Sequence, residues 1–465
     1  MKLVTNFLFL SGAEVFSKIV TFAAIAYLAR VLGPAGFGSV EFAGSVLLCA
    51  GLIVDQGFGP YGAREIAREP GRTGNLVGEI ILTRFILAIL AYASVIAFAL
   101  WLNRGDAMTQ LLAIYGLSLL PMPLLLQWVF QGHSQMQVVG ILQLIRQTIF
   151  ASVVFAFTRT PADMWIVGGA EIAGVVGAAA FGVWMYLRRF EISRVRFELT
   201  RRLFQEGVPI GLSQMFWMIR MFGATVIVGI IALPADVGFF GGAMRILIAL
   251  HAFIWLYFFN LLPTLAQTWH NNDGSFAALI ERSFTIVVWA GALGGIVWVL
   301  VAPLVMMTVY GEQFAPAGPM LQWLAVVAVV AALSGHYRFG LIAAGQQNWE
   351  TLAAALGALV AIVLIPVGYT LAGGTGAAMG LVAAEIVVWV SAWWWARARL
   401  QLNGHAALLI RPLIAVVIAW GLASLAPFTP SLQIALAVAT IIVAALVLDV
   451  RARVRVRALF KKSLP

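Results

Sequence analysis

Apolar stretches of about 20 residues, bounded by proline, glycine and charged residues, recur along the whole 465-residue chain. A helix of this length matches the thickness of the hydrocarbon core of a bilayer. The pattern predicts fourteen membrane-spanning helices and hence an all-α, polytopic integral membrane protein. The predicted spans are Asn6–Arg30, Gly38–Pro60, Glu79–Leu102, Thr109–Phe130, Ile141–Phe157, Ala162–Leu187, Gly207–Ile231, Gly238–Leu262, Ser283–Thr308, Gly318–Ala343, Thr351–Leu371, Thr375–Ala396, Leu408–Leu425 and Ser431–Leu448.

The composition excludes a water-soluble fold. Hydrophobic residues make up 62% of the chain and charged residues only 10%, whereas soluble domains contain roughly 25% charged residues. The single cysteine, Cys49, excludes an intramolecular disulfide and a thiolate metal cluster. The first apolar stretch is not followed by a small-residue cleavage site, so we expect it to be a retained helix.

Positive charge is segregated between alternate loops. The formal net charge is +10, and most Lys and Arg residues lie on the side that also carries both termini. That side carries Lys2, Arg64, Arg68, Arg72, Arg188, Arg189, Arg194, Arg196, Arg201, Arg202, Arg282, Arg397, Arg399, Arg411 and the tail from Arg451 to Lys462. The opposite loops carry only Arg30, Arg104 and Arg159. Because cytoplasmic loops are enriched in Lys and Arg, this predicts cytoplasmic termini, and the basic surface favours anionic lipid rather than nucleic acid as a partner.

The longest polar segment divides the helices into two related blocks. We expect a bundle of six helices at residues 1–187, a basic cytoplasmic linker at 188–206, a second six-helix bundle at 207–396, an extra helix pair at 397–450 and a basic tail at 451–465. A shift of 200 residues aligns Pro34-Ala-x-x-Gly38 with Pro234-Ala-x-x-Gly238 at the same helix junction. Both blocks begin on the same side, so this is a parallel repeat of the kind found in transporters built from two bundles.

Several charged residues lie within the predicted spans, where an ionised group costs at least ~2.5 kcal/mol. Lys18 lies near the middle of the first helix, Arg220 near the middle of the seventh, and Arg245 two turns inside the eighth. Lys18 belongs to a polar stripe that includes Glu14, and neutralisation of one by the other is an alternative explanation for that pair. Arginine binds phosphate through two donors and lysine as a point charge, so these cations predict a cavity for an anionic head group.

The remaining intramembrane charges are secondary candidates. Arg84 and Arg338 could contact the same head group, or could extend to the nearby helix ends, as could Arg146. Glu171 and Glu385 lie deep in their helices, so each could pair across helices or carry a proton. Glu41, near the outer end of the second helix, is a further candidate for proton coupling.

The sequence gives no indication of an enzyme. The predicted outer loops are short, and phosphate-binding loops, metal-spaced Cys/His clusters and hydrolase motifs are missing from the sequence. We therefore expect no catalytic residue, no metal and no cofactor.

Four stretches carry a resemblance to a known family. They are Ala29-Arg-Val-Leu-Gly-Pro-Ala-Gly-Phe-Gly38, Asp55-Gln-Gly-Phe-Gly59 with Ala63-Arg-Glu-Ile-Ala-Arg68, Phe130-Gln-Gly132 and Tyr310-Gly-Glu-Gln-Phe314. In this order along the chain they resemble the polysaccharide-exporter branch of the multidrug/oligosaccharidyl-lipid/polysaccharide (MOP) exporter superfamily, which contains the O-antigen flippases. The last two predicted helices resemble the extra pair that many members carry.

The resemblance implies two six-helix bundles in a pseudo-two-fold arrangement, which alternate between inward and outward openings. It implies that the cargo is an undecaprenyl-diphosphate-linked oligosaccharide, moved across a bacterial inner membrane. A polysaccharide polymerase and the chain-length machinery are candidate partners.

Three alternatives stay open at this point. A drug/cation antiporter of the same superfamily would need a net acidic cavity. A polytopic transferase or polymerase acting on lipid-linked glycan would need an essential outer carboxylate, for which Asp106, Asp163, Asp236 and Glu312 are the available residues. A non-transporting assembly subunit would tolerate the loss of every buried charge.

Overall fold

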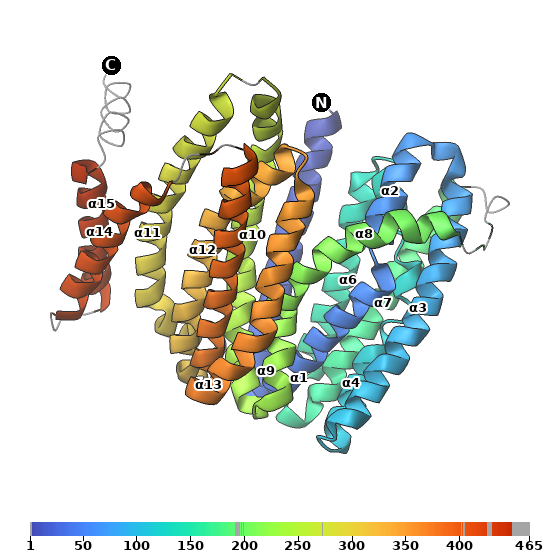
Figure 1. Cartoon of the computed structure of the whole chain (residues 1–465). Coiled ribbons are helices and arrows are strands. Elements are labelled where there is room, and N and C mark those ends of the chain that lie inside the picture. The colour runs from blue at the N-terminus through green and yellow to red at the C-terminus, as the bar shows by residue number, and fades with distance from the viewer. Residues whose placement is uncertain are drawn as a thin grey trace. The chain divides into compact units, whose positions relative to one another are not determined.

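The fold is helical throughout the described part of the chain. The structure is a computed structural model, and it describes residues 2–190, 196, 198, 200–271, 273–400, 402, 405–425 and 430–448. Within these ranges there are helices and connecting turns but no strands (Figure 1). The predicted all-α, multi-spanning class is confirmed. The basic tail at 451–465 lies outside the described residues.

The helices follow one another with short connections. The first fourteen elements are α1 (Lys2–Asp55), α2 (Phe58–Arg68), η1 (Pro70–Arg72), α3 (Thr73–Leu102), α4 (Asp106–Leu117), η2 (Met122–Leu124), α5 (Gln127–Gly132), α6 (Met136–Phe157), η3 (Pro161–Asp163), α7 (Met164–Arg189), α8 (Arg201–Met218), η5 (Ile219–Gly223), α9 (Ala224–Ile231) and α10 (Pro234–Asn271). The others are α11 (Ser275–Tyr310), η6 (Glu312–Ala317), α12 (Gly318–Ala343), α13 (Gln347–Leu400), α14 (Ala406–Leu425) and α15 (Pro430–Leu448).

Twelve helices in the described ranges are long and apolar enough to cross a membrane. Two of them, α1 and α13, contain 54 residues each. At ~1.5 Å per residue this is more than twice the ~30 Å of a bilayer core. Each is interrupted near its middle, at Gly33 (φ 67°) in α1 and at Ala372 and Gly373 in α13. Counting α1 and α13 as two crossings each would give fourteen spans, which stays a prediction.

Most observed helices extend beyond the predicted spans, and two predicted spans are interrupted by non-helical backbone. The predicted helix Thr109–Phe130 is divided into α4, η2 and α5, because Pro121 and Pro123 cannot continue the backbone hydrogen bonds of a helix. The predicted helix Gly38–Pro60 ends at Asp55, since Gln56 (φ 43°) and Gly57 (φ 78°) adopt left-handed conformations. A separate helix, α2, then begins at Phe58.

The chain divides into two compact units. Unit 1 contains residues 1–242 and 309–313, and unit 2 contains residues 243–308 and 314–465. The division falls inside α10, near its first turns, whereas the predicted bundles meet at the 188–206 linker. Unit 1 therefore includes α8, η5 and α9. The two six-helix bundles stay a prediction.

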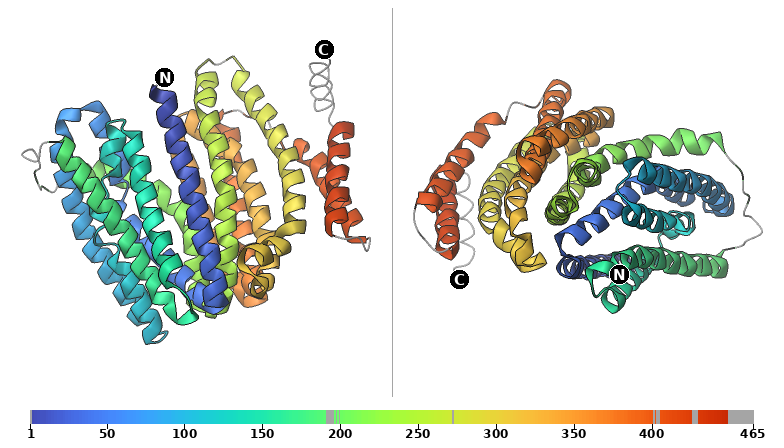
Figure 2. Two further views of the ribbon diagram at one scale, coloured as in Figure 1. Left: turned by 180° about the vertical axis from the view of Figure 1, so that it is seen from behind. Right: turned by 90° about the horizontal axis from the view of Figure 1, so that it is seen from below.

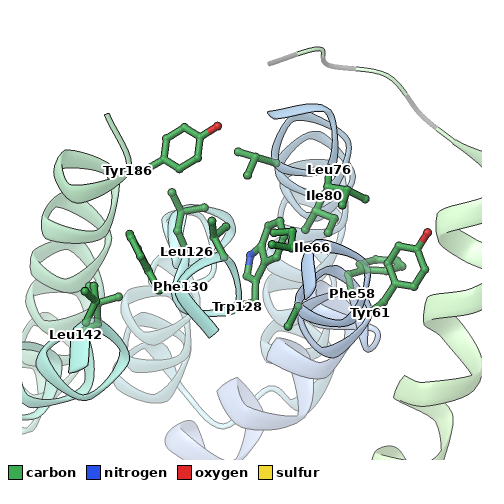
Figure 3. Packing of buried hydrophobic residues seen from close by; sticks show 14 of the residues in the cluster. Phe58, Tyr61, Ile66, Leu76, Ile80, Leu126, Trp128, Phe130, Leu142 and Tyr186 are labelled. Atoms are coloured by element: carbon green, nitrogen blue, oxygen red, sulfur yellow. The ribbon is translucent and has the colours of Figure 1, made fainter. Parts of the chain in front are cut away.

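Unit 1 has a large apolar core where α2, α3, α5 and α7 meet. Phe58, Ile66, Ile80, Trp128 and Phe130 are among its buried members (Figure 3). The amphipathic α2 packs its apolar face into this core, while Arg64 and Arg68 lie on its exposed face. We call this end of unit 1, with α2, η1 and the start of α8, the basic end, because Arg72, Arg201 and Arg202 also lie there.

The repeated Pro-Ala-x-x-Gly turns pack against each other within unit 1. A Cβ atom added to Gly38 would lie 1.8 Å from the carbonyl oxygen of Pro234, and one added to Gly238 would lie 2.1 Å from the carbonyl oxygen of Pro34. The contact is reciprocal, as expected of two related turns that meet across a local two-fold axis. Only glycine permits the two backbones to approach this closely.

Unit 2 has two separate apolar clusters. The larger one lies between α11, α12 and α13 and includes Phe284, Tyr337 and Val388. The smaller one packs α14 and α15 against α11 around Ile296 and Ala419. The two last described helices lie side by side in both views (Figures 1 and 2).

Candidate functional site

The two cations predicted for the middle of the membrane differ in their surroundings. Lys18 on α1 is exposed, whereas Arg220 is fully buried. Arg220 lies in η5, a five-residue π-helical segment between α8 and α9 that packs against α1. Such segments are rare and occur frequently at functional sites. The sequence marked Arg220 by its charge, but it contained no signal for the π-helix.

Arg245 and Glu41 lie on helices of different units. Arg245 is half-buried on the part of α10 that belongs to unit 2. Glu41 on α1 is buried, and its side chain packs against Gly241. The side chain of Glu14 lies outside the described part of the structure.

Arg84 forms an ion pair inside unit 1. Its guanidinium donates to Oδ1 of Asp55, at the end of α1, and the same oxygen accepts a hydrogen bond of 3.3 Å from the backbone N–H of Gly59. Arg84 is only 6% exposed. The sequence suggested that Arg84 extends to its own helix end. In the structure it instead forms an ion pair with a carboxylate from another helix.

Arg146 and Glu171 form a second pair in unit 1. Arg146 on α6 donates to Glu171 on α7 at 2.5 Å, and both side chains are partly buried. Glu171 thus pairs across helices, which was one of the two roles considered for it. Whether it also carries a proton stays a prediction.

The third pair lies in unit 2. Arg338 on α12 donates to one oxygen of Glu350 on α13 through Nη2 at 2.5 Å and through Nε at 2.9 Å. Their side chains are 14% and 12% exposed. Glu385, also on α13, is fully buried and lies close enough to Arg338 to act on it electrostatically. These three residues form a buried charged cluster inside one unit.

Sequence analysis missed the acidic partners Asp55 and Glu350. Asp55 stands in the Asp55-Gln-Gly-Phe-Gly59 stretch, which carries part of the family resemblance but gives no indication of an ion pair. Glu350 lies in the first turn of α13, where an acidic residue has an ordinary role at the positive end of the helix dipole. Neither position suggested a pair with an arginine on another helix.

Two of the three arginines assigned to the outer loops bind backbone carbonyls. Arg104 donates to the carbonyl oxygens of Ile230 and Ala232, both at 2.8 Å, and Arg30 donates to that of Val309 at 3.0 Å. Ile230 and Val309 lie in the last turns of α9 and α11 and Ala232 directly follows α9, so these carbonyls are not used by the helices. These contacts, all in unit 1, account for arginines on a side that is otherwise poor in positive charge.

An ionic network joins α8 to α2 at the basic end. Glu206 on α8 accepts hydrogen bonds from Arg64 at 2.6 Å and from Arg202 at 2.8 Å, and Arg202 also lies 3.4 Å from Glu65. Hydrogen bonding from Arg202 lowers the pKa of Glu206 below its ordinary value and raises the pKa of Arg202.

The model of one family matches more than half of the chain. The family described as "Polysaccharide biosynthesis protein" matches residues 3–269. The chain belongs to this family. Among curated proteins, the putative O-antigen transporter of Escherichia coli (strain K12) is 21% identical over 395 residues, which cover 82% of this chain and 94% of that protein.

Solved structures of a flippase and of a transporter share the fold of this family member. The lipid II flippase MurJ in an inward closed conformation has a TM-score of 0.72 at 12% identity, with 95% of this chain and 98% of that chain covered. An inward-facing multidrug resistance MATE family transporter of the MOP superfamily has a TM-score of 0.67 at 16% identity, with 83% and 94% covered. The resemblance inferred from the sequence is confirmed for family and fold.

Proposed function

We propose that the protein is a flippase that moves an undecaprenyl-diphosphate-linked oligosaccharide across the bacterial inner membrane by alternating access. The observation that carries this proposal is the family match over residues 3–269. The matched segment also contains the three candidate cations Lys18, Arg220 and Arg245. The similarity to the putative O-antigen transporter supports a glycan as cargo, and the MurJ-like fold supports a lipid carrier.

The physical problem in this transport is the polar head group. Each unpaired hydroxyl costs several kcal/mol in hydrocarbon, and a diphosphate costs far more. Lys18, Arg220 and Arg245 would offset part of this cost for the diphosphate. In this proposal the basic end of unit 1 faces the cytoplasm, both termini are cytoplasmic, and anionic lipid contacts the basic tail.

A drug/cation antiporter is the second candidate, because the MATE transporter shares the fold. An antiporter for cationic drugs would need uncompensated acid in its cavity. In unit 1, the carboxylates of Asp55 and Glu171 are instead paired with arginine. This pairing favours the glycan flippase.

A transferase or polymerase would need a free outer carboxylate. Asp163 accepts hydrogen bonds from the backbone N–H groups of Arg159 and Thr160, so it caps η3. Alanine at Asp106, Asp236 and Glu312 would abolish glycan polymerisation if the protein were such an enzyme. The flippase proposal expects lipid-linked units to be polymerised normally in these variants.

Deletion and complementation in the host test the proposal. Without the gene, complete lipid-linked repeat units should accumulate on the cytoplasmic side and surface glycan should be lost. Lys18→Gln, Arg220→Gln and Arg245→Gln should restore at least about tenfold less surface glycan than the parent, since each removes a cation from the path of the diphosphate. Arg159→Gln, which changes an exposed outer residue, is the matched control and should complement fully.

Membrane levels of each variant, measured by immunoblot, separate a folding defect from a transport defect. Normal export by all three variants would contradict the assignment of these cations. An unchanged glycan profile after deletion would contradict the flippase function itself.

A further inference from the structure

Unit 1 contains a cavity near its basic end. It has a volume of about 280 Å³ and lies between the end of α1, the start of α2, α3 and α5. Its polar wall is formed by Asp55, Arg84, Gln127, Trp128 and Gln131. The volume is just below the usual range for small-molecule sites, about 300–1,000 Å³, so it suits one ring rather than a whole oligosaccharide.

Several hydrogen-bonding groups of this wall are not used by the protein. Gln127 and Gln131, one helical turn apart on α5, make no side-chain hydrogen bond to any other described residue, and neither does Oδ2 of Asp55. Asp55 is 37% exposed, so this oxygen can be reached. The wall therefore offers a carboxylate oxygen and two amides, which can donate and accept hydrogen bonds at adjacent positions.

Two buried donors in the same wall also have no acceptor in the described part of the chain. They are Nε of Arg84 and Nε1 of Trp128. Trp128 is a buried member of the apolar core and is drawn between Ile66 and Leu126 in Figure 3. Buried donors without acceptors are rare in folded proteins and call for a structural or functional explanation. Both atoms are fully buried, so they do not themselves face the cavity, and recognition of a ligand falls to Asp55, Gln127 and Gln131.

The charge of the wall selects the class of ligand. The positive charge of Arg84 is compensated by Asp55, to which it is bonded. A diphosphate would have to compete with the Asp55 carboxylate for the Arg84 guanidinium. A cationic ligand would be repelled by that guanidinium. The lining is thus neutral overall but rich in paired donors and acceptors, which is the complement of an uncharged molecule with neighbouring hydroxyl groups.

We propose that this cavity, the Arg84–Asp55 pocket, binds one uncharged sugar residue of the cargo glycan. Asp55, Gln127 and Gln131 would bind neighbouring hydroxyls of that residue, while Arg84 holds Asp55 in place. The inference rests on the proposed flippase function and deepens it, because it separates recognition of the sugar from recognition of the diphosphate by Lys18, Arg220 and Arg245.

The test uses the full-length protein in nanodiscs and the free glycan, released from its lipid by mild acid so that it lacks the diphosphate. Binding is measured by saturation-transfer NMR. Gln127→Leu and Gln131→Leu remove hydrogen bonds, and Gly51→Leu fills the cavity, since a Cβ at Gly51 would meet only the flexible end of Met122 at 3.4 Å. Each variant should bind the free glycan about tenfold more weakly or worse.

Matched controls change the same residue types outside the pocket. Gly169→Leu lies on α7, where a Cβ meets nothing within 4 Å, and Gln110→Leu lies on the exposed surface of α4. Both should bind the free glycan as the parent does. Arg220→Gln should also retain this binding, although it should lose export.

The outcomes separate this inference from the proposed function. Parent-like glycan binding by Gly51→Leu and Gln131→Leu, or no saturable binding by the parent, would overturn the pocket. If the parent fails to move lipid-linked glycan in proteoliposomes, the flippase function fails whatever the binding result. If only the pocket variants lose glycan binding and the parent transports lipid-linked glycan, both the pocket and the flippase function are supported.

Discussion

At the scale of single residues, three arginines on the apolar helices are paired with carboxylates inside their own units. Arg84 pairs with Asp55, Arg146 with Glu171 and Arg338 with Glu350. Removing a charge from water is costly, so a buried pair contributes little net stability, but the loss of one partner leaves the other charge uncompensated. Substitution of only one residue of such a pair should therefore destabilise the fold, whereas substitution of both should be better tolerated.

The Arg338–Glu350 pair gives a direct prediction. Glu350→Gln should lower the free energy of unfolding by about 3–5 kcal/mol, because it leaves a guanidinium in a site that is only 14% exposed. The double variant Arg338→Met/Glu350→Met removes both charges of the pair but leaves the buried Glu385 without the nearby guanidinium, so it should recover only part of this loss. Thermal unfolding of the purified protein in detergent measures both changes.

The control for this pair is Glu69→Gln, whose exposed carboxylate lies 3.8 Å from Arg72. It should change the melting temperature much less than Glu350→Gln. If the double variant is as unstable as Glu350→Gln, then Arg338 and Glu350 do more than neutralise each other's charge, and the ion pair itself stabilises the fold. If it is stable but does not export glycan, Arg338 contacts the cargo as the sequence predicts.

At the scale of helices, the apolar pattern was sufficient for most of the fold. Long apolar runs predict spanning helices because the bilayer allows few other structures. The repeated Pro-Ala-x-x-Gly turn was recognised in the sequence, but the contact between Gly38 and Gly238 was not predicted. The break of one predicted helix at Pro121 and the π-helix around Arg220 were missed. The break follows from Pro121 and Pro123, which count as tolerated residues in a hydropathy pattern but remove backbone hydrogen bonds. The π-helix is a change of backbone geometry that hydropathy does not describe.

The candidate site was predictable only in part, for a related reason. A charge within an apolar run, such as Arg84 or Arg338, is visible in the sequence. Its partner is not, because Glu350 lies in the first turn of a helix, where an acidic residue is ordinary, and the end of α1 at Asp55 is not marked in the apolar pattern. The pocket around Asp55 combines residues from four helices, so only the packed structure could reveal it.

The contact between α8 and α2 predicts a dependence on pH. Hydrogen bonding from Arg202 lowers the pKa of Glu206 in the folded state. The stabilising effect of the ionised carboxylate is therefore fully present above the unfolded-state pKa and is lost as the pH falls through the lower folded-state value. Amide hydrogen exchange in α8, corrected for the intrinsic rate, should accelerate over this acidic range.

Glu206→Gln should already exchange faster at neutral pH and should show a weaker acceleration on acidification. Glu65 also contacts Arg64 and Arg202, so Glu65→Gln is the comparison that assigns the effect. An acceleration of equal size in Glu206→Gln and the parent would show that Glu206 is not the titrating group.

At the scale of the whole molecule, the division into units fits the proposed alternating access. The chain passes between the units at Gly242–Ala243, Thr308–Val309 and Gln313–Phe314. Within unit 1, Tyr310 donates to the carbonyl of Gly242 at 3.2 Å, and Gln313 donates to those of Ala29 and Arg30. Hydrogen bonds thus hold the crossing segments at their unit 1 ends, so we expect motion between units to leave unit 1 itself unchanged.

Spin labels can test this expectation because Cys49 is the only native cysteine. In a Cys49→Ser background, one label pair at Gly71 and Gln110 lies within unit 1, and another at Gly71 and Asp273 joins the two units. Lipid-linked glycan added to the protein in nanodiscs should shift the distance distribution of the second pair, since cargo favours one opening over the other. The first pair should keep its distribution. An equal shift in both pairs would place the motion inside unit 1, and no shift in either would contradict alternating access by movement of these units.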